Sequence, residues 1–154
     1  MMGNQFSANR TAAKWLWLPA TMVIVAAMLL LAPNRTQAAT TTCGTVSCLQ
    51  NALSGAQPGD VINLSAGVTF NGTFTASADG TSSSPITLQT DSANPAVVDG
   101  GTISSGYALH ITGDYWIVKN IKITDAKKGI MLDNANHTLI DGVEVYNIGE
   151  EGVH

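Results

Sequence analysis

Residues 117–123 read IVKNIKI, and residues 139–145 read LIDGVEV. The two stretches share one pattern: two apolar residues, a charged residue, asparagine or glycine, then an apolar, a charged and an apolar residue. Asparagine and glycine enter the left-handed backbone region at low cost, so a recurring sharp bend between two strands selects them. The pattern therefore predicts that the two stretches are equivalent segments of a structural repeat.

The same pattern extends toward the amino terminus. Aligned on the bend, the flanking sequences are TFNGTF, VVDGGTI, IVKNIKI and LIDGVEV, which makes Gly72, Gly100, Asn120 and Gly142 the predicted structural turn residues. A second column contains Leu109, Ile130 and Val153, which recur at nearly the same spacing. A period of about 22 residues with three short strands predicts an all-β fold, a parallel β-helix or solenoid, in which each turn of chain stacks on the previous one. The competing fold, an antiparallel sandwich, would show hairpin signals about every 8 to 12 residues.

Side chains alternate between the two faces of each predicted strand. The inward set is predicted to be Leu109, Ile111, Ile121, Ile123, Ile130, Leu132, Val143 and Val145, and the outward set His110, Lys122, Met131 and Glu144. In this register Asp99, Lys119 and Asp141 stack with alternating charge, and Lys122 lies beside Glu144. Opposite charges on neighbouring strands contribute roughly 0.2 to 1 kcal/mol each.

The amino-terminal segment has the features of a secretory signal peptide, predicted over residues 1–38. Basic residues precede the apolar run at 15–32, and TQA at 36–38 provides a small residue for cleavage. The alternative is an uncleaved membrane anchor, since about 18 apolar residues could just span a bilayer. Either reading places the rest of the chain outside the cytosol, and we expect a secreted, extracellular protein.

Residues 39–59 are predicted to form an amino-terminal extension with a short capping helix, followed by β-helix rungs over residues 60–154. Ser47 is the expected helix cap and Gly55 the expected helix end. Cys43 and Cys48 are the only cysteines, and an exported compartment favours their disulfide. The alternative is a free thiol or metal site, although two cysteines without nearby histidines cannot complete a tetrahedral zinc site.

The predicted mature chain is acidic. It contains four lysines, no arginine and eleven acidic residues, for a net charge of −7 with neutral histidines. Such a surface repels nucleic acid and anionic membranes, so neither is expected as a partner once the leader is cleaved. An acidic polymer could approach only through bridging cations or a local basic patch. Lys127, Lys128, Glu150 and Glu151 are expected to lie in turns, with the two lysines solvated.

The segments LQNALSGAQPGDVINLSAGVTF, SSSPITL, AVVDGG, YALHITGDYWIVKNIKIT and KGIMLDNANHTLIDGVEVYNIGEEGVH resemble the amino-terminal part of right-handed parallel β-helix proteins of the pectin-lyase-like superfamily. The resemblance covers residues 47–154. It is specific for fold and weak for reaction, because this superfamily includes lyases, hydrolases, esterases and proteins without demonstrated activity. It implies an amino-terminal fragment, truncated at its carboxy-terminal end, of a protein that is monomeric when full length.

The resemblance also implies a chemistry. The polysaccharide lyases of this family cleave acidic sugars by β-elimination, in which a calcium ion or basic group neutralises the uronate carboxylate and a neutral Arg or Lys removes the neighbouring proton. Substrate lies along the sheet from which His110, Asp133 and His154 project, so these are the candidate substrate-binding residues. Asp133 is also the candidate ligand of a calcium site that the full-length protein would complete. Catalytic residues are not identified, and the segment by itself is expected to be inactive.

Two other functions stay open at this point. The first is a non-catalytic surface module, either an adhesin or a glycan-binding solenoid, which would continue as a long repeat array. The second is an inverting glycosidase on the same fold, which requires paired carboxylates about 6.5 to 9.5 Å apart. The sequence shows no such pair.

Overall fold

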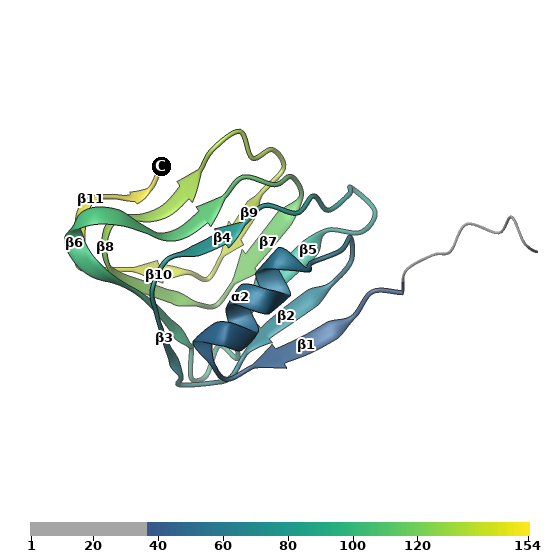
Figure 1. The fold of residues 1–154 in the computed structure, drawn as a ribbon, viewed down its shortest axis with the longest axis horizontal. Coiled ribbons are helices and arrows are strands. Elements are labelled where there is room, and N and C mark those ends of the chain that lie inside the picture. Colours follow the sequence, from purple (N-terminus) through teal and green to yellow (C-terminus); the bar gives the residue numbers. More distant parts are fainter. Residues whose placement is uncertain (1–36) are drawn as a thin grey trace, which may run out of the picture. The chain divides into compact units, whose positions relative to one another are not determined.

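The computed structural model describes residues 37–154, so the predicted signal peptide lies outside the described residues apart from its last two. One helix is present in this part, α2 (Val46–Ser54). The strands are β1 (Thr40–Cys43), β2 (Val61–Leu64), β3 (Thr69–Asn71), β4 (Phe74–Ala76), β5 (Ile86–Gln89), β6 (Val97–Ile111), β7 (Trp116–Lys119), β8 (Lys122–Leu132), β9 (Leu139–Asp141), β10 (Glu144–Val145) and β11 (Ile148–Val153). These elements form one compact unit (Figure 1).

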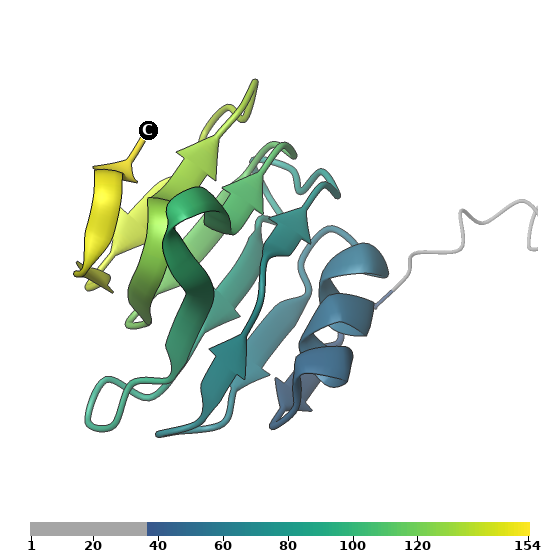
Figure 2. The same ribbon diagram turned by 60° about the vertical axis from the view of Figure 1, so that its left-hand side comes forward.

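Every pairing between these strands is parallel, and each strand pairs with strands of neighbouring turns of the chain. One sheet has the order β1-β2-β5-β7-β9. The other has the order β10-β8-β6-β3, with β4 also on β6 and β11 also on β8. The strands β6 and β8 are long because each continues through a bend, and their second halves pair with β4 and β11. The predicted parallel β-helix is confirmed, and the turns follow one another in sequence order from α2 to β11 (Figure 2).

The predicted column of four turn residues is wrong, because it combines two different bends. Asn120 stacks with Gly142 after β7 and β9, where Lys119 pairs with Asp141 and the Asn120 backbone N–H donates to the Asp141 carbonyl at 3.0 Å. Gly72 stacks with Gly100 after β3 and the first half of β6, and the Gly72 N–H donates to the Asp99 carbonyl at 2.8 Å. No pairing within residues 37–154 joins Gly100 to Asn120.

The second bend continues with other residue types. Asp99 pairs with Thr124, so Asp125 and then Asn147 take the positions after Gly100. Both have left-handed backbones, with φ of 51° and 50°, and the Asn147 side-chain amide donates to the Asp125 carboxylate. Aspartate and asparagine tolerate this region almost as well as glycine does when they bond locally. The predicted stacking of Asp99 on Lys119 is wrong for the same reason. Lys119 pairs on that side with Gln89, and Asp99 pairs with Thr124.

The inward-facing positions were predicted correctly. Leu109, Ile111, Ile121, Ile123 and Ile130 are at most 1% exposed and belong to one continuous apolar core. Leu132, Val143 and Val145 are partly buried and pack against this core, whereas Val153 is 48% exposed. The column of Leu109, Ile130 and Val153 is confirmed by the register of β6, β8 and β11. Apolar burial along the stack is the main favourable free energy of this fold.

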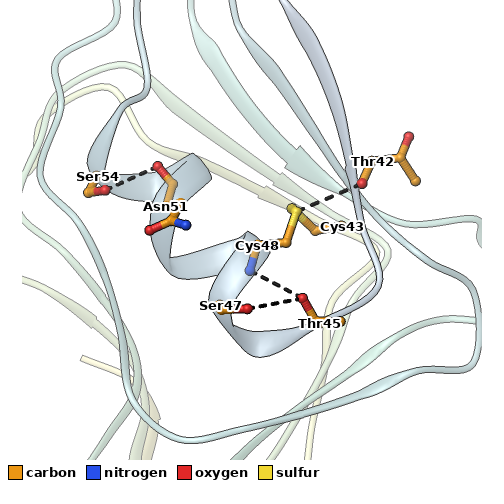
Figure 3. Close-up of a disulfide and its surroundings, with 7 residues drawn as sticks. All are labelled: Thr42, Cys43, Thr45, Ser47, Cys48, Asn51 and Ser54. Carbon is orange, nitrogen blue, oxygen red and sulfur yellow. Dashed lines mark hydrogen bonds between the residues drawn. A yellow bond between two sulfur atoms is a disulfide. The ribbon is translucent and has the colours of Figure 1, made fainter.

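The capping helix is confirmed, with one change at its start. Thr45, and not Ser47, is the N-cap, and its side-chain oxygen accepts from the Cys48 backbone N–H at 3.3 Å (Figure 3). Gly55 ends the helix as predicted, and its N–H donates to the Asn51 carbonyl. The helix packs against β1, β2 and β4, with Leu49 and Leu53 each 1% exposed.

The predicted disulfide is also present. Cys43 at the end of β1 is bonded to Cys48 in the first turn of α2, so the bond joins the first strand to the helix (Figure 3). Closing so short a loop stabilises the fold by roughly 2 kcal/mol through the entropy of the unfolded chain.

Candidate functional site

Two of the three predicted binding residues occupy one column on the sheet formed by β4 and the second halves of β6 and β8. Thr75, His110 and Met131 are aligned across these strands. His154 continues the column, because its backbone N–H donates to the Ile130 carbonyl and its own carbonyl accepts from the Leu132 N–H, both at 2.9 Å. The two histidines are therefore two rungs apart, with Met131 between them.

The third predicted residue lies beside this column. The Asp133 carboxylate is 3.7 Å from His110 Nε2, and the centroid of the Tyr107 ring is 5.0 Å from that of the imidazole. The His110 side chain is 24% exposed, but its Nε2 atom is buried and has no hydrogen-bond partner among the described residues. His110 and Asp133 form a pair, whereas the His154 side chain contacts Glu151 instead. Their role in binding stays a prediction.

The surroundings of Asp133 do not fit a calcium ion. Its nearest polar neighbours besides His110 include the Asn134 amide at 3.4 Å. Across residues 37–154, no three His, Cys, Asp or Glu side chains converge on a point that could hold a metal ion. Calcium takes six to eight oxygen ligands, commonly including several carboxylates, and no such carboxylate cluster forms around Asp133 within residues 37–154. Calcium binding by a longer form of the protein stays a prediction.

The structure corrects the environment of two lysines. Lys127 and Lys128 lie within β8, not in a turn, and Glu150 and Glu151 lie within β11. Lys127 Nζ is 3.1 Å from Glu150, and Lys128 Nζ is 3.0 Å from Glu151. The signal was present in the sequence, since each lysine precedes its glutamate by the same interval that separates Ile130 from Val153.

Every lysine of the described part has a carboxylate partner on the following rung. The other two pairs, both predicted from the sequence, are Lys119 with Asp141 at 3.8 Å and Lys122 with Glu144 at 2.9 Å. The hydrogen bond with Glu144 raises the pKa of Lys122, and the hydrogen bond from Lys128 lowers the pKa of Glu151. Such pairing favours the ammonium form of Lys122, which is therefore poorly suited to removing a proton.

A pocket missed by the sequence reasoning lies next to His110. It has a volume of about 270 Å³ and is lined by Ser104, Ser105, Gly106, Tyr107, Lys127 and Lys128. The first four residues come from the middle of β6, and the two lysines come from β8. The pocket thus brings hydroxyl groups, an aromatic ring and two ammonium groups together at the edge of the candidate face.

A ladder of polar side chains supports the corner that follows Asp133. The Asp114 backbone N–H donates to Asp79 at 2.9 Å, and Asp114 Oδ1 accepts from the Asn136 backbone N–H at 2.7 Å and side-chain amide at 3.0 Å. The Tyr115 and His137 rings stack at the same corner with centroids 4.6 Å apart. The hydrogen bonds from Asn136 lower the pKa of Asp114 below its usual 3.8.

Replacing Asp114 by asparagine is expected to destabilise the protein above about pH 4 and not in strong acid. The folded-state pKa of Asp114 lies below its unfolded value, so the stabilisation is complete above about pH 4 and is lost as the pH falls through the folded pKa. Thermal unfolding from pH 7 to pH 2 should show a lower Tm for Asp114→Asn at pH 7 and convergence with the wild type in acid. A difference in Tm that is the same at every pH would contradict the charge argument.

These features define a class of protein: a parallel β-helix with an outer face of polar columns and an adjacent pocket lined by two lysines, two serines and a tyrosine. The chain belongs to the Pel9A-like family, in its right-handed beta helix region, which matches residues 29–154. The fold is therefore of the polysaccharide-lyase-like type, and its right hand follows from the family. This agrees with the pectin-lyase-like resemblance seen in the sequence.

Solved structures of two alginate lyases are similar to this chain. An alginate lyase from Paenibacillus sp. str. FPU-7 is 56% identical, with a TM-score of 0.74, over 75% of this chain and 39% of that one. The PL6 family alginate lyase AlyGC is 23% identical, with a TM-score of 0.57, over 69% of this chain and 15% of that one, and so shows the fold alone. The chain thus spans well under half the length of these enzymes. A comparison with curated proteins finds no match.

Proposed function

We propose that this protein binds or acts on an acidic polysaccharide built from uronic acids, with alginate as the first candidate. The observation that carries the proposal is the 56% identity with the Paenibacillus alginate lyase over 75% of the chain. The site supports it, because two lysines, two serines and a tyrosine line a pocket beside the imidazoles of the candidate face. An anionic sugar needs a local positive charge on a chain that is otherwise acidic.

The described residues support binding better than proton abstraction. In β-elimination the uronate carboxylate is neutralised while a base takes the neighbouring proton, and that base must be neutral. All four lysines in residues 37–154 are in ion pairs with carboxylates, and the pKa of Lys122 is raised by its pair. We assign carboxylate neutralisation and sugar binding to this segment, with no base among its lysines.

We place the protein outside the cytosol, as the predicted leader over residues 1–38 implies. The Cys43–Cys48 disulfide supports this, because such bonds persist in oxidising compartments. Within residues 37–154 the structure contains no helix of the length and apolarity needed to cross a membrane. A secreted protein would meet an extracellular polysaccharide directly.

The test is calorimetric titration of the purified chain with oligomers of alginate, and with a neutral glucan oligomer of the same length as the control. We expect heat of binding with the acidic oligomer alone, and no unsaturated product in the ultraviolet spectrum after prolonged incubation. Equal affinity for the neutral oligomer would favour the alternative, a general glycan-binding solenoid. Turnover by the chain would show that a described side chain does act as the base.

A further inference from the structure

The pocket owes its shape to an insertion in β6. Thr102 pairs with Ala126 and Tyr107 pairs with Lys128, so β6 uses three more residues than β8 between the same two rung positions. Residues 103–106 leave the ladder and are exposed, and Ile103 is 49% exposed although it is apolar. A bulge that adds no buried surface and stands beside a polar face is typical of a functional site.

The bulge is held in place by its neighbours. A Cβ on Gly149 of β11 would overlap the Ile103 carbonyl oxygen, so the absence of a side chain there allows the bulge to reach past β8 and contact β11, two rungs further along the stack. Within the bulge, the Thr102 and Ser104 hydroxyl groups are 2.8 Å apart. A wall fixed at both ends forms a pocket before any ligand arrives, which lowers the entropic cost of binding.

Two ammonium groups line the pocket, and each is paired with a glutamate of β11. Lys127 and Lys128 are two of the four lysines in residues 37–154, and Lys128 is only 19% exposed. An ammonium group has three donors, and in each lysine one is directed at Glu150 or Glu151. The remaining donors can reach a carboxylate, although Glu150 and Glu151, which contact the two lysines, oppose an incoming anion.

We propose that this pocket binds a single uronate unit, with Lys127 and Lys128 donating to its carboxylate, Ser104 and Ser105 bonding to its hydroxyl groups, and Tyr107 packing against the sugar ring. The proposal rests on the proposed function and assigns the residues that recognise the acidic sugar. A volume of about 270 Å³ suits one sugar unit rather than a longer segment. Because the Tyr107 ring adjoins His110, the sugar unit bound in the pocket would lie next to the units of the same polysaccharide chain that cover the histidine column.

The test is calorimetric titration of the full chain with an alginate tetramer. It compares variants that remove a positive charge with variants that remove a negative charge. Lys127→Met and Lys128→Met are each expected to weaken binding about tenfold, as for hydrogen bonds to a charged group. Glu150→Gln and Glu151→Gln are expected to leave binding unchanged or tighten it, since they remove repulsion. Lys122→Met is the matched control, because it also breaks a lysine–glutamate pair between β8 and the following rung but lies outside the pocket.

The outcomes separate the two proposals. If the wild type binds the tetramer and the Lys127 and Lys128 variants bind as well as Lys122→Met does, the pocket assignment is wrong while the proposed function stands. If the wild type binds neither alginate nor another polyuronate, the proposed function fails and this assignment fails with it. Should the lysine variants not fold, Ser104→Ala changes only the exposed bulge, and its binding should weaken about fivefold. Unchanged binding by that variant would also overturn the assignment.

Discussion

Replacing Trp116 by alanine is expected to lower the free energy of unfolding by about 3 to 5 kcal/mol. Trp116 is completely buried at the start of β7 and is the largest side chain of the core. Its indole N–H donates to the Ala78 carbonyl at 2.8 Å, so it also ties the corner after β4 to a strand one turn later. The substitution would leave a cavity and remove that hydrogen bond together. Since domains are stable by about 5 to 15 kcal/mol, much of the stability would be lost.

The measurement is urea denaturation followed by circular dichroism, which does not depend on tryptophan fluorescence. Trp116→Phe is the matched control, because it keeps most of the buried ring but leaves the Ala78 carbonyl without this donor. We expect a loss of about 1 to 3 kcal/mol for that variant, the cost of leaving a partly buried acceptor without its donor. A loss below about 1 kcal/mol for Trp116→Ala would contradict the burial seen at this position.

Replacing Gly113 by alanine is the second change with a large expected effect. A Cβ at this position would overlap the Ala78 carbonyl oxygen and lie 2.7 Å from the Ala78 carbonyl carbon. These are backbone atoms of the preceding turn, so no flexible side chain can move aside. The same carbonyl accepts the hydrogen bond from Trp116, and any displacement would strain that contact as well. We expect a loss of about 1 to 3 kcal/mol, as for an overpacked core.

Gly152 in β11 provides the control for this prediction. A Cβ there would be 3.5 Å from the nearest atom of Val145, an ordinary contact, and neither glycine has a positive φ. Gly152→Ala should therefore change the urea midpoint by much less than Gly113→Ala. Equal effects of the two substitutions would show that the loss of stability comes from replacing a glycine as such, and not from the close approach of the Ala78 backbone to Gly113.

Much of the fold could be predicted because a solenoid repeats its pattern along the chain. The interval from IVKNIKI at 117–123 to LIDGVEV at 139–145 is the length of one turn, and strands β7 and β9 do pair in that register. The same interval predicts the ion pair of Lys122 with Glu144. These predictions succeed because each residue of a parallel stack meets the residue one period later.

The bends could not be assigned from residue type alone. Each turn of chain has several corners, and all of them select residues that tolerate a left-handed backbone. Gly100 was matched to Asn120, whereas its true successor at that corner is Asp125. The interval between rungs also varies wherever a bulge adds residues, as between Thr102 and Tyr107. A pattern of local conformation therefore cannot say which corner a residue occupies.

The sequence by itself predicted that the chain is a stack of parallel turns, which positions face inward, and that Cys43 and Cys48 form a disulfide. Only the tertiary structure decided the corners and the pocket beside the bulge of β6. The physical reason is that periodic burial is written into residues close along the chain. Which residues line a pocket depends instead on how far an insertion shifts one rung against the next. The backbone pairing of the folded protein sets that shift.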